Sequence, residues 1–510
     1  MDNRLAIMSQ EKNGGRVLIL FLLFFVALYQ FYSAGFSAFA IICLLPLVIP
    51  VIYVAFTWQM FVFWALIFIN YFLQFFNKLQ LLPNGIPISM YNEMLEILLI
   101  VIAIIDARKY PHFERTANIM LITLLCWSCF CTLEVLNDTC DMGIDIGSWY
   151  GGARMMAFQL VYAFVVFTLY ITTPERLMKY LRILAALSLF SVFWVWKQSH
   201  IGLTPVESSW LNNVGRSTHI LNGGTLIRYW STHNDAANYG INAAATAVIY
   251  IVMAITTKLR SDRIFFAITA VLIIWGMFQS GTRTAIACLI LGFMVVLVLL
   301  RSVKIIVPSA IFGGIMFALL VFTTIGNGNQ QIRRMRSAFN KDDASANVRT
   351  INQEAIRKYI ADAPWGLGLA ANYNNVPANN KYRKLSTIPP DSEYVFIWVH
   401  TGPIGIITFL ILTAIMFLGA CYVVLVKLKS RSLIGVGAGF CGAFAAIQLG
   451  GYGNQVLMQF PNCLIFYGGL TIVYILPYIE NEWTVYEDKR VAVETEKRRL
   501  KLEKKKASRV

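Results

Sequence analysis

The chain has 510 residues, of which 57% are hydrophobic and only 14% are charged, and its formal net charge is +16. Apolar runs long enough to span a membrane recur from end to end, and the mean hydropathy is +0.61, which excludes a water-soluble globular protein. The basic excess does not indicate a nucleic-acid partner, because the cytoplasmic connections of membrane proteins are themselves rich in Lys and Arg. We therefore predict an all-α polytopic membrane protein.

Apolar segments of spanning length predict about fourteen transmembrane helices, and twelve to fourteen fit the pattern. In chain order the expected helices cover residues 17–34, 37–55, 58–76, 89–106, 117–136, 153–172, 181–197, 239–257, 264–279, 284–300, 305–323, 399–426, 433–449 and 463–479. The first also has the charge and length of a signal peptide. Because apolar sequence continues directly after it, we expect an uncleaved helix.

Short basic connections between these helices orient the chain. Their basic residues are Arg108, Lys109 and Arg115; Arg176, Lys179 and Arg182; Lys258, Arg260 and Arg263; Arg301 and Lys304; and Lys427, Lys429 and Arg431. With both termini in the cytoplasm, all of these connections lie on the cytoplasmic side, as the positive-inside rule requires.

This orientation divides the chain into four parts. They are transmembrane helices one to eleven in residues 1–323 with an external loop at 198–238, a large external and catalytic loop at 324–398, helices twelve to fourteen in 399–479, and a charged cytoplasmic tail at 480–510.

Arg283 stands between two predicted spans, in the segment QSGTRT of residues 279–284. An arginine so close to the hydrocarbon costs from about 3 to more than about 10 kcal/mol when nothing offsets it. It must therefore face a polar cavity or hold an anion, which makes it a candidate functional residue. The sequence contains no spaced Cys/His cluster, no H-E-x-x-H pattern and no calcium loop, so we expect neither a metal nor another cofactor.

The loop 324–398 is strongly basic although it is predicted to lie outside. Its Lys and Arg residues are Arg333, Arg334, Arg336, Lys341, Arg349, Arg357, Lys358, Lys381, Arg383 and Lys384. Long loops are translocated largely regardless of charge, which is one explanation. The other is an anionic ligand, since arginines suit bidentate contacts with phosphate. Within the loop, residues 347–358 predict an amphipathic helix and residues 363–368 predict a turn.

The second external segment is suited to sugar recognition. Residues 228–235 (RYWSTHND) combine Arg228, His233 and Asp235 with aromatic side chains. Sugar hydroxyls bind planar hydrogen-bonding groups, and ring faces stack on aromatic residues. Tyr and Trp also belt membrane interfaces for ordinary reasons, so the polar residues carry more of this prediction.

A possible base lies where the large loop returns to the membrane. Residues 389–394 (PPDSEY) start another short helix, for which Asp391 or Ser392 is the expected N-cap. Asp391 is therefore either a cap or a general base. His400, further along, is either a packed residue at the interface or the base.

Three elements resemble the O-antigen ligase and O-antigen polymerase superfamily. Residues 280–285 (SGTRTA) look like its arginine-containing element between two spans. Residues 347–368 (NVRTINQEAIRKYIADAPWGLG) resemble its external R…P-x-x-G-x-G stretch, and residues 391–406 (DSEYVFIWVHTGPIGI) resemble its following H-N-x-Y-L…G-x-x-G element. Order, spacing and membrane side agree over about residues 210–425.

The resemblance implies roles for individual residues. Arg283 and Arg349 match the arginines that engage the diphosphate of a lipid-linked donor. Asp391 stands where the ligases carry a histidine base, and Ser392 where they carry asparagine, which favours a polymerase. The catalytic base is one of Asp391, Glu393 and His400. The further residues expected to bind substrate are Arg228, His233, Asp235, Arg357 and Tyr394.

The family implies a metal-independent glycosyltransferase in the bacterial inner membrane. An O-antigen or capsular polysaccharide polymerase transfers a glycan from a polyprenyl diphosphate, such as undecaprenyl diphosphate, to an acceptor sugar hydroxyl at the outer face of this membrane. Expected partners are the lipid-linked oligosaccharide and membrane lipid, with a chain-length regulator and a flippase as further candidates. Two alternatives stay open: a ligase that attaches the polymer to a lipid or protein acceptor, and a transporter or flippase for lipid-linked sugars.

Overall fold

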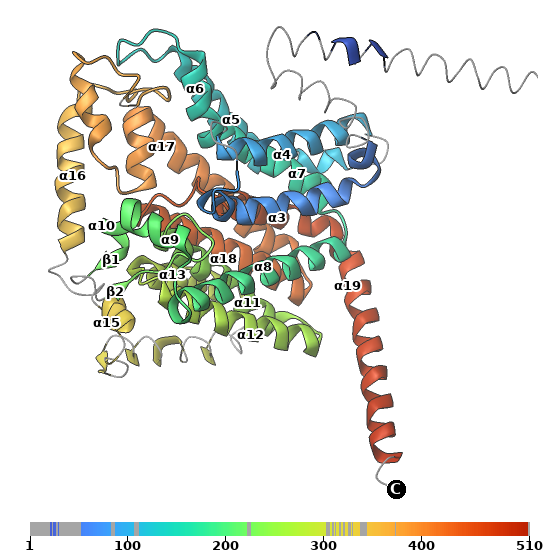
Figure 1. Cartoon of the computed structure of the whole chain (residues 1–510). Helices are drawn as coiled ribbons and strands as arrows, with labels where there is room; N and C mark the ends of the chain where they lie inside the picture. The colour runs from blue at the N-terminus through green and yellow to red at the C-terminus, as the bar shows by residue number, and fades with distance from the viewer. Residues whose placement is uncertain are drawn as a thin grey trace, which may run out of the picture. The chain divides into compact units, whose positions relative to one another are not determined.

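The computed structural model describes residues 53–82, 87–106, 112–221, 226–301, 344–372 and 374–507, together with single residues and short stretches within 21–29 and 307–336. The described residues form helices, apart from their connections and one two-stranded sheet (Figure 1). The chain divides into two compact units, residues 1–65 and 66–510. The description below concerns the second unit, and helix α3 crosses the boundary between them.

Eleven helical segments of the described residues are long and apolar enough to cross a membrane. They are Gln59–Lys78 (α3), Ile88–Ile105 (α4), Ile119–Leu136 (α5 and η2), Ile146–Tyr170 (α6, η3 and α7), Pro174–His200 (α8), Ala236–Thr256 (α11), Arg260–Gln279 (α12), Arg283–Leu300 (α13), Glu393–Lys427 (α17 and η8), Arg431–Gly453 (α18) and Asn462–Leu500, within α19 (Asn462–Ala507). Each corresponds to a predicted span, so the prediction of an all-α polytopic membrane protein is confirmed. The other predicted spans, at 17–34, 37–55 and 305–323, lie largely outside the described residues.

Helices α11, α13 and α18 pack against one another in the centre of the second unit. Glycines allow α13 and α18 to approach closely. A Cβ atom on Gly442 would lie 2.5 Å from the carbonyl oxygen of Gly292, and one on Gly292 would lie 2.8 Å from that of Gly442. Small residues at such crossings favour helix association in membranes, where van der Waals packing is the main driving force. This contact sets the start of α13, at Arg283, against the end of α18, at Gly453.

The polar half of α19 gathers the basic connections at one end of this unit. Arg182 and Arg490 both pair with Asp262, at 2.6 and 3.0 Å, and Lys258 pairs with Asp488 at 2.9 Å. The connections that hold Arg115 and Ser430 also contact α19, through Tyr478 and Glu480 respectively. Segments that the charge pattern predicts to share one side of the membrane therefore meet in the fold, and α19 extends beyond them (Figure 1).

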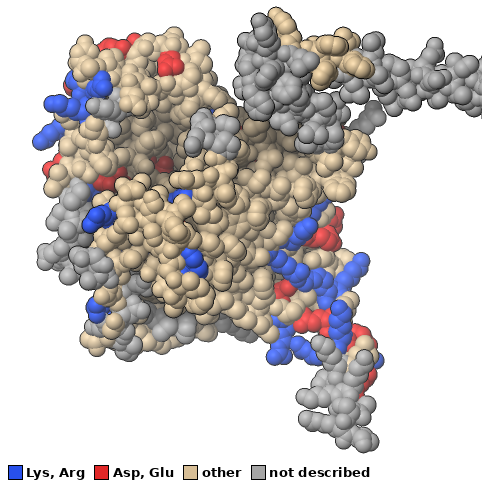
Figure 2. Space-filling model, in the orientation of Figure 1, with Lys and Arg blue, Asp and Glu red and all other residues tan. Residues whose placement is uncertain are grey.

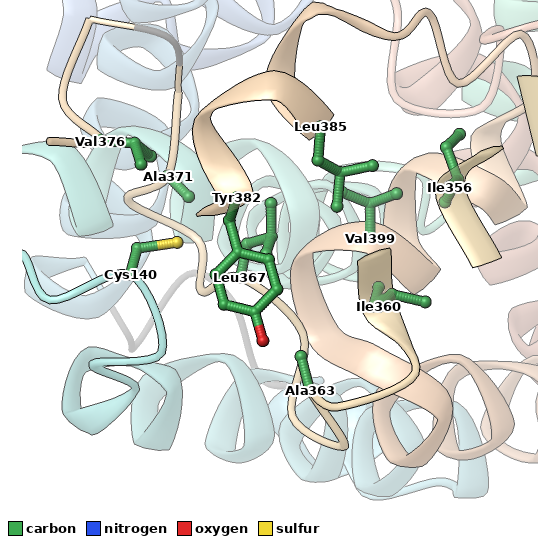
Figure 3. Packing of buried hydrophobic residues seen from close by; sticks show 10 residues of the cluster. All are labelled: Cys140, Ile356, Ile360, Ala363, Leu367, Ala371, Val376, Tyr382, Leu385 and Val399. Carbon is green, nitrogen blue, oxygen red and sulfur yellow. The ribbon is translucent and has the colours of Figure 1, made fainter. Parts of the chain in front are cut away.

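The second half of the large loop has a hydrophobic core of its own (Figure 3). Helix α16 (Ala344–Ile360) confirms the predicted amphipathic helix, and the 3-10 helix η7 (Lys381–Thr387) follows. Side chains from α16, η7, the start of α17 and the α5–α6 connection meet in one cluster. Its buried members are Cys140, Ile356, Ile360, Ala363, Leu367, Ala371, Val376, Tyr382, Leu385 and Val399. This core holds α16 against α17.

The turn predicted at 363–368 packs on a break in α17. Gly402 interrupts the helix with φ 65° and ψ −174°, and the amide of Leu367 donates a 2.9 Å hydrogen bond to the carbonyl of Val399. A Cβ atom on Gly402 would lie 2.1 Å from the carbonyl oxygen of Pro364. Only glycine fits this left-handed and crowded position. Thus α17 has a short part before Gly402, which belongs to the loop, and an apolar part after it.

The other predicted external segment forms a compact cap over the start of α11. It contains α9 (Pro205–Trp210), η4 (Leu211–Gly215), α10 (Arg216–His219) and the antiparallel strands β1 (Ile220–Leu221) and β2 (Leu226–Ile227). The ammonium of Lys78, at the end of α3, lies 3.5 Å from the ring centroid of Trp210 and 4.9 Å from that of Trp230. Such cation–π contacts stabilise a lysine that is partly removed from water. They tie α3 to the segment that carries Arg228.

Candidate functional site

The turn between α12 and α13 is the centre of the candidate site. Its glycine, Gly281, has φ 56°, and a Cβ atom there would lie 3.3 Å from Cδ of Arg334 and 3.4 Å from Cγ of Arg228. Arg228 Nε donates to the carbonyl of Ser280 at 3.2 Å, and Arg334 Nε donates to the carbonyl of Gly281 at 2.8 Å. Because α13 begins at Arg283, the turn brings three arginines together.

Arg228 is positioned by the strands before it. Its amide donates to the carbonyl of His219 at 2.9 Å, and its Nη1 donates to the carbonyl of Thr218 at 3.0 Å. Removal from water lowers the pKa of Arg228 below its ordinary value; the Asp235 carboxylate opposes this, whereas the positive charges of Arg283 and Arg349 add to it. These guanidinium groups therefore lie close enough to repel one another. An anion placed between them would relieve that repulsion.

Arg349 reaches the same place from α16. Its Nη2 donates to the carbonyl of Gly453 at 2.6 Å, the last residue of α18, where the helix dipole favours a positive charge. A Cβ atom on Gly453 would lie 2.9 Å from the hydroxyl of Thr284, the residue after Arg283. The end of α18 thus contacts Arg349 directly and the start of α13, next to Arg283, through Thr284.

Asp391 lies next to this arginine-bearing face of α16. Its Oδ2 accepts a 2.8 Å hydrogen bond from Nδ2 of Asn352, which follows Arg349 by one turn. The residue has φ 53°, a conformation that costs a non-glycine residue about 1–3 kcal/mol and clusters at functional sites. Ser392 occupies the N-cap position of α17 but makes no side-chain cap. Its hydroxyl donates instead to the carbonyl of Gly451 at 3.1 Å, so Ser392 is the N-cap residue, one of the two that the sequence predicted, although its side chain does not cap the helix.

The two other candidate bases are engaged elsewhere. Glu393 is 3% exposed, and its Oε2 accepts from the amide of Leu457 at 3.1 Å. His400 follows two turns later, roughly 10 Å along α17, where its Nδ1 lies 2.9 Å from the carbonyl oxygen of Phe396. Of the three candidates, Asp391 is the one that hydrogen-bonds to Asn352, one turn after Arg349 on α16.

The remaining predicted substrate contacts divide into two groups. Asp235 accepts from the amide of Asn238 at 2.8 Å and so caps α11, close to Arg228. The hydroxyl of Tyr394 donates to Gln448, on the side of α17 that faces α18. His233 and Arg357 make no described contact with the arginine cluster at the α12–α13 turn.

His233 is completely buried and Arg357 is exposed. The His233 ring centroid lies 5.8 Å from that of Tyr71 and 5.3 Å from that of Tyr239. Burial lowers the pKa of His233 to about 3, so it is a neutral, packed side chain near pH 7. Arg357 is exposed, two turns beyond Arg349 on α16.

Arg334 is the residue that sequence reasoning did not single out. It was visible as one of several basic residues of the loop, but nothing in the pattern distinguished it from Arg333 or Arg336. Its contact with Gly281 depends on a fold that joins residues far apart in the chain. On the face shown in Figure 2, Lys and Arg side chains gather around α16 and along the tail, and the surface is hollowed beside α17.

Comparison with known proteins finds a similarity in the central part of the chain. A family model described as O-Antigen ligase matches residues 268–410. No curated protein matches the chain. The matched segment contains Arg283, Arg334, Arg349 and Asp391, whereas Arg228 lies before it. Among the residues that the structure describes, no group of three His, Cys, Asp or Glu side chains is arranged to hold a metal ion.

Proposed function

We propose that this chain is a metal-independent glycosyltransferase acting on a polyprenyl-diphosphate-linked glycan, and the match of residues 268–410 to the O-antigen ligase family model supports this proposal. The observation that carries this proposal is the convergence of Arg228, Arg283 and Arg349 at the end of α18, beside the carboxylate of Asp391. The family acts on lipid-linked oligosaccharides, whose diphosphate suits such a cluster.

The reaction exchanges one bond at the anomeric carbon for another. The bond from this carbon to the diphosphate oxygen breaks, and its electron pair leaves with the polyprenyl diphosphate, which gains a negative charge. The acceptor hydroxyl oxygen forms the new bond, and its proton passes to the Asp391 carboxylate. Guanidinium groups that are fixed before the substrate binds stabilise the departing negative charge without having to reorganise. Metal ions stabilise that charge in other transferases.

The polymerase is the preferred member of the family. The resemblance places a histidine base in the ligases where this chain has Asp391, and here Asn352 holds that carboxylate next to Arg349. The acceptor is then the sugar of another lipid-linked repeat. A ligase that attaches a finished polymer to a lipid or protein acceptor is the alternative within the family.

A transporter of lipid-linked sugars is the second class of function. It is favoured by one observation, an ion pair of 3.5 Å between Arg154 and Glu93 inside membrane helices, because intramembrane charges often mark transport pathways. The Glu93 carboxylate also accepts a 2.6 Å hydrogen bond from Gln159. These contacts link α4 to η3 (Arg154–Phe158) and to α7 (Gln159–Tyr170). They therefore support a structural role for the ion pair.

The arginine cluster lies at the end of the helices opposite to the basic connections. By the positive-inside rule the basic connections and both termini face the cytoplasm, and the site faces the outside of the bacterial inner membrane. A flippase would deliver the donor to that face, and a chain-length regulator would act on the product there.

Glycan profiling of cells that lack this protein tests the proposal. If the missing protein is a polymerase, these cells carry single repeat units on the final anchor and no long chains. If it is a ligase, long chains accumulate on the polyprenyl carrier. An unchanged profile contradicts both, whereas loss of surface chains of every length, with donor accumulating on the inner leaflet, supports the transporter.

A further inference from the structure

The polar half of α19 runs along the ends of other membrane helices (Figure 1). Its Glu480 accepts from the amide of Ser430, just before α18, and its Glu494 accepts from the hydroxyl of Ser261, in the first turn of α12. The short links 428–430 and 257–259 join consecutive spans there, so both contacts lie where spans end. The two glutamates are about 20 Å apart along the helix axis. A helix standing upright on the membrane would make only one of these contacts, so this half of α19 follows the membrane surface.

One face of this half makes the contacts. Trp483 and Glu487 are buried, Arg490 and Glu494 are half-buried, and most residues between them are exposed. Because they are spaced three or four residues apart, all four lie on one side of the helix. Their partners, at the starts of α18 and α12, are Ser432, Asp262 and Ser261. This side, which we call the membrane-side face, is therefore turned toward the bilayer.

Helix α19 continues past the last helix that it contacts. Among the described residues, Glu494 makes the final contact of α19 with another segment, and residues 495–507 extend the helix by roughly 20 Å. Within about two turns of Ser261, α12 exposes Ile264 and Ile268, as expected where a membrane helix contacts lipid. The extension, which Figure 1 shows passing beyond α12, therefore lies over lipid headgroups.

The charge of α19 changes where its protein contacts end. Before that point its acidic residues bind the connections between spans, as Asp488 does with Lys258. After it, residues 497–506 contain seven Lys and Arg and one Glu, and Figure 2 shows basic side chains along this tail. The helical register continues the membrane-side face through Arg498, Lys501 and Lys505. The face thus becomes basic where its neighbour changes from protein to lipid.

We propose that the end of α19 is an interfacial helix that binds anionic phospholipid headgroups on the side of the membrane that holds the basic connections. Basic clusters next to a membrane span are typical of binding to anionic lipid, and each Lys or Arg near the surface adds to the affinity. The charge would also attract an acidic protein, but the face that carries it is turned toward the bilayer. This surface lies at the end opposite the arginine cluster, so the inference is independent of the proposed function.

Hydrogen exchange of residues 495–507 tests this inference. The full-length protein is placed in nanodiscs of phosphatidylcholine, either alone or mixed with phosphatidylglycerol. A short helix without packing is only marginally stable, so the extension should exchange quickly in phosphatidylcholine. Phosphatidylglycerol should slow this exchange at least about tenfold. Salt at about 1 M should remove the protection, because it shortens the Debye length to about 3 Å.

Two variants with equal charge changes show which face binds. The first combines the membrane-side substitutions Arg498→Gln, Lys501→Gln and Lys505→Gln. The matched control removes the same charge from the opposite side of the helix by combining Lys489→Gln, Arg499→Gln and Lys506→Gln. The first variant should lose the protection by phosphatidylglycerol. The control should keep most of it, because the opposite sides of a helix are about 10 Å apart, a distance similar to the Debye length near physiological salt.

Several outcomes overturn the proposal. Equal exchange in the two kinds of nanodisc means that the extension does not bind anionic lipid. Equal loss of protection in the two variants means that no face is turned toward the bilayer. Protection that persists at about 1 M salt indicates apolar packing. Protection in phosphatidylcholine that requires two copies in one nanodisc indicates a contact between copies of this chain. Thermal midpoints of both variants check that the remaining fold is intact.

Discussion

The two ends of the helical unit are both rich in basic residues, but they hold them differently. At the end that contacts the polar half of α19, carboxylates neutralise the cations: Asp262 pairs with Arg182 and Arg490, and Asp488 pairs with Lys258. These interactions fasten the connections to α19.

At the opposite end, arginines donate to main-chain oxygens. Arg228 and Arg349 bind the carbonyls of Ser280 and Gly453. A neutral carbonyl orients a guanidinium without cancelling its charge, so the group keeps its attraction for an anion. The comparison shows that the partners of the basic residues, rather than their number, distinguish an end built for cohesion from one suited to ligand binding.

The largest effect is expected from Arg283→Lys. One ammonium does not reproduce the bidentate fork of a guanidinium, and loss of one such donor costs roughly 100- to 1,000-fold in turnover. Polymer on the cell surface should disappear, as measured by its length distribution. The matched control is Arg431→Lys at the opposite end, which should leave the distribution unchanged. Wild-type chain lengths from Arg283→Lys would show that the site lies elsewhere.

The next largest effect is expected from Asp391→Asn, which should lose turnover by about 100-fold or more while it retains donor binding. The amide keeps the size of the side chain but does not accept the proton. Single-turnover transfer and equilibrium binding of the donor separate the two quantities. Asp362→Asn, an exposed partner of Lys381 in the same loop, controls for a change of charge. Full turnover in Asp391→Asn would move the base to His400.

At the end that contacts α19, Asp262→Asn should lower the thermal stability and leave KM and kcat unchanged. Asp262 is 4% exposed and joins two arginines; loss of one partner of a buried charge network costs up to about 3–5 kcal/mol. The thermal midpoint in detergent should fall, while KM and kcat per folded molecule stay unchanged. Asp488→Asn, at an exposed pair, should change the midpoint little. A raised donor KM in Asp262→Asn would contradict the separation of the two ends.

The smallest effect near neutral pH is a change in stability that involves His219, whose carbonyl accepts from the amide of Arg228. Burial lowers its pKa to about 3, and the charges of Arg228 and Lys78 contribute. The unfolded chain takes up this proton near pH 6.5 and the folded chain does not, so stability is highest above 6.5 and falls as the pH decreases toward 3.

Its Nε2 also accepts from the amide of Ala236 at 3.1 Å, a bond that protonation would break. Thermal midpoints of His219→Gln should therefore depend less on pH between 6.5 and 5 than those of the wild type. Equal slopes would show that this histidine is not the titrating group.

Much of the fold was predictable because hydropathy and charge act locally. Each of the eleven described spans corresponds to an expected one, and four of the five basic connections that the charge pattern put on one side, those with Arg115, Arg182, Lys258 and Ser430, meet around α19. The amphipathic helix and the proline–glycine turn of the large loop were also visible, since their patterns lie within a few residues.

The candidate site was predictable only in part. Arg283 and Arg349 followed from their motifs, and the fold brings them together. The sequence left three bases open, because nothing in it shows that Glu393 binds the amide of Leu457 or that Asp391 meets Asn352. His233 appeared polar and available in the sequence, yet it is enclosed by two tyrosines from other helices.

By itself, the sequence determined that this chain spans a membrane many times and which segments do so, and it predicted a function for one arginine between two spans. Those properties follow from the transfer of local segments between water and hydrocarbon. The tertiary structure alone decided that Arg228 and Arg334 lie at the turn before Arg283 and that the carboxylate of Asp391 meets Asn352 on α16. These depend on close packing between α13 and α18 and on the core that holds α16 to α17, which are contacts between segments far apart in the chain.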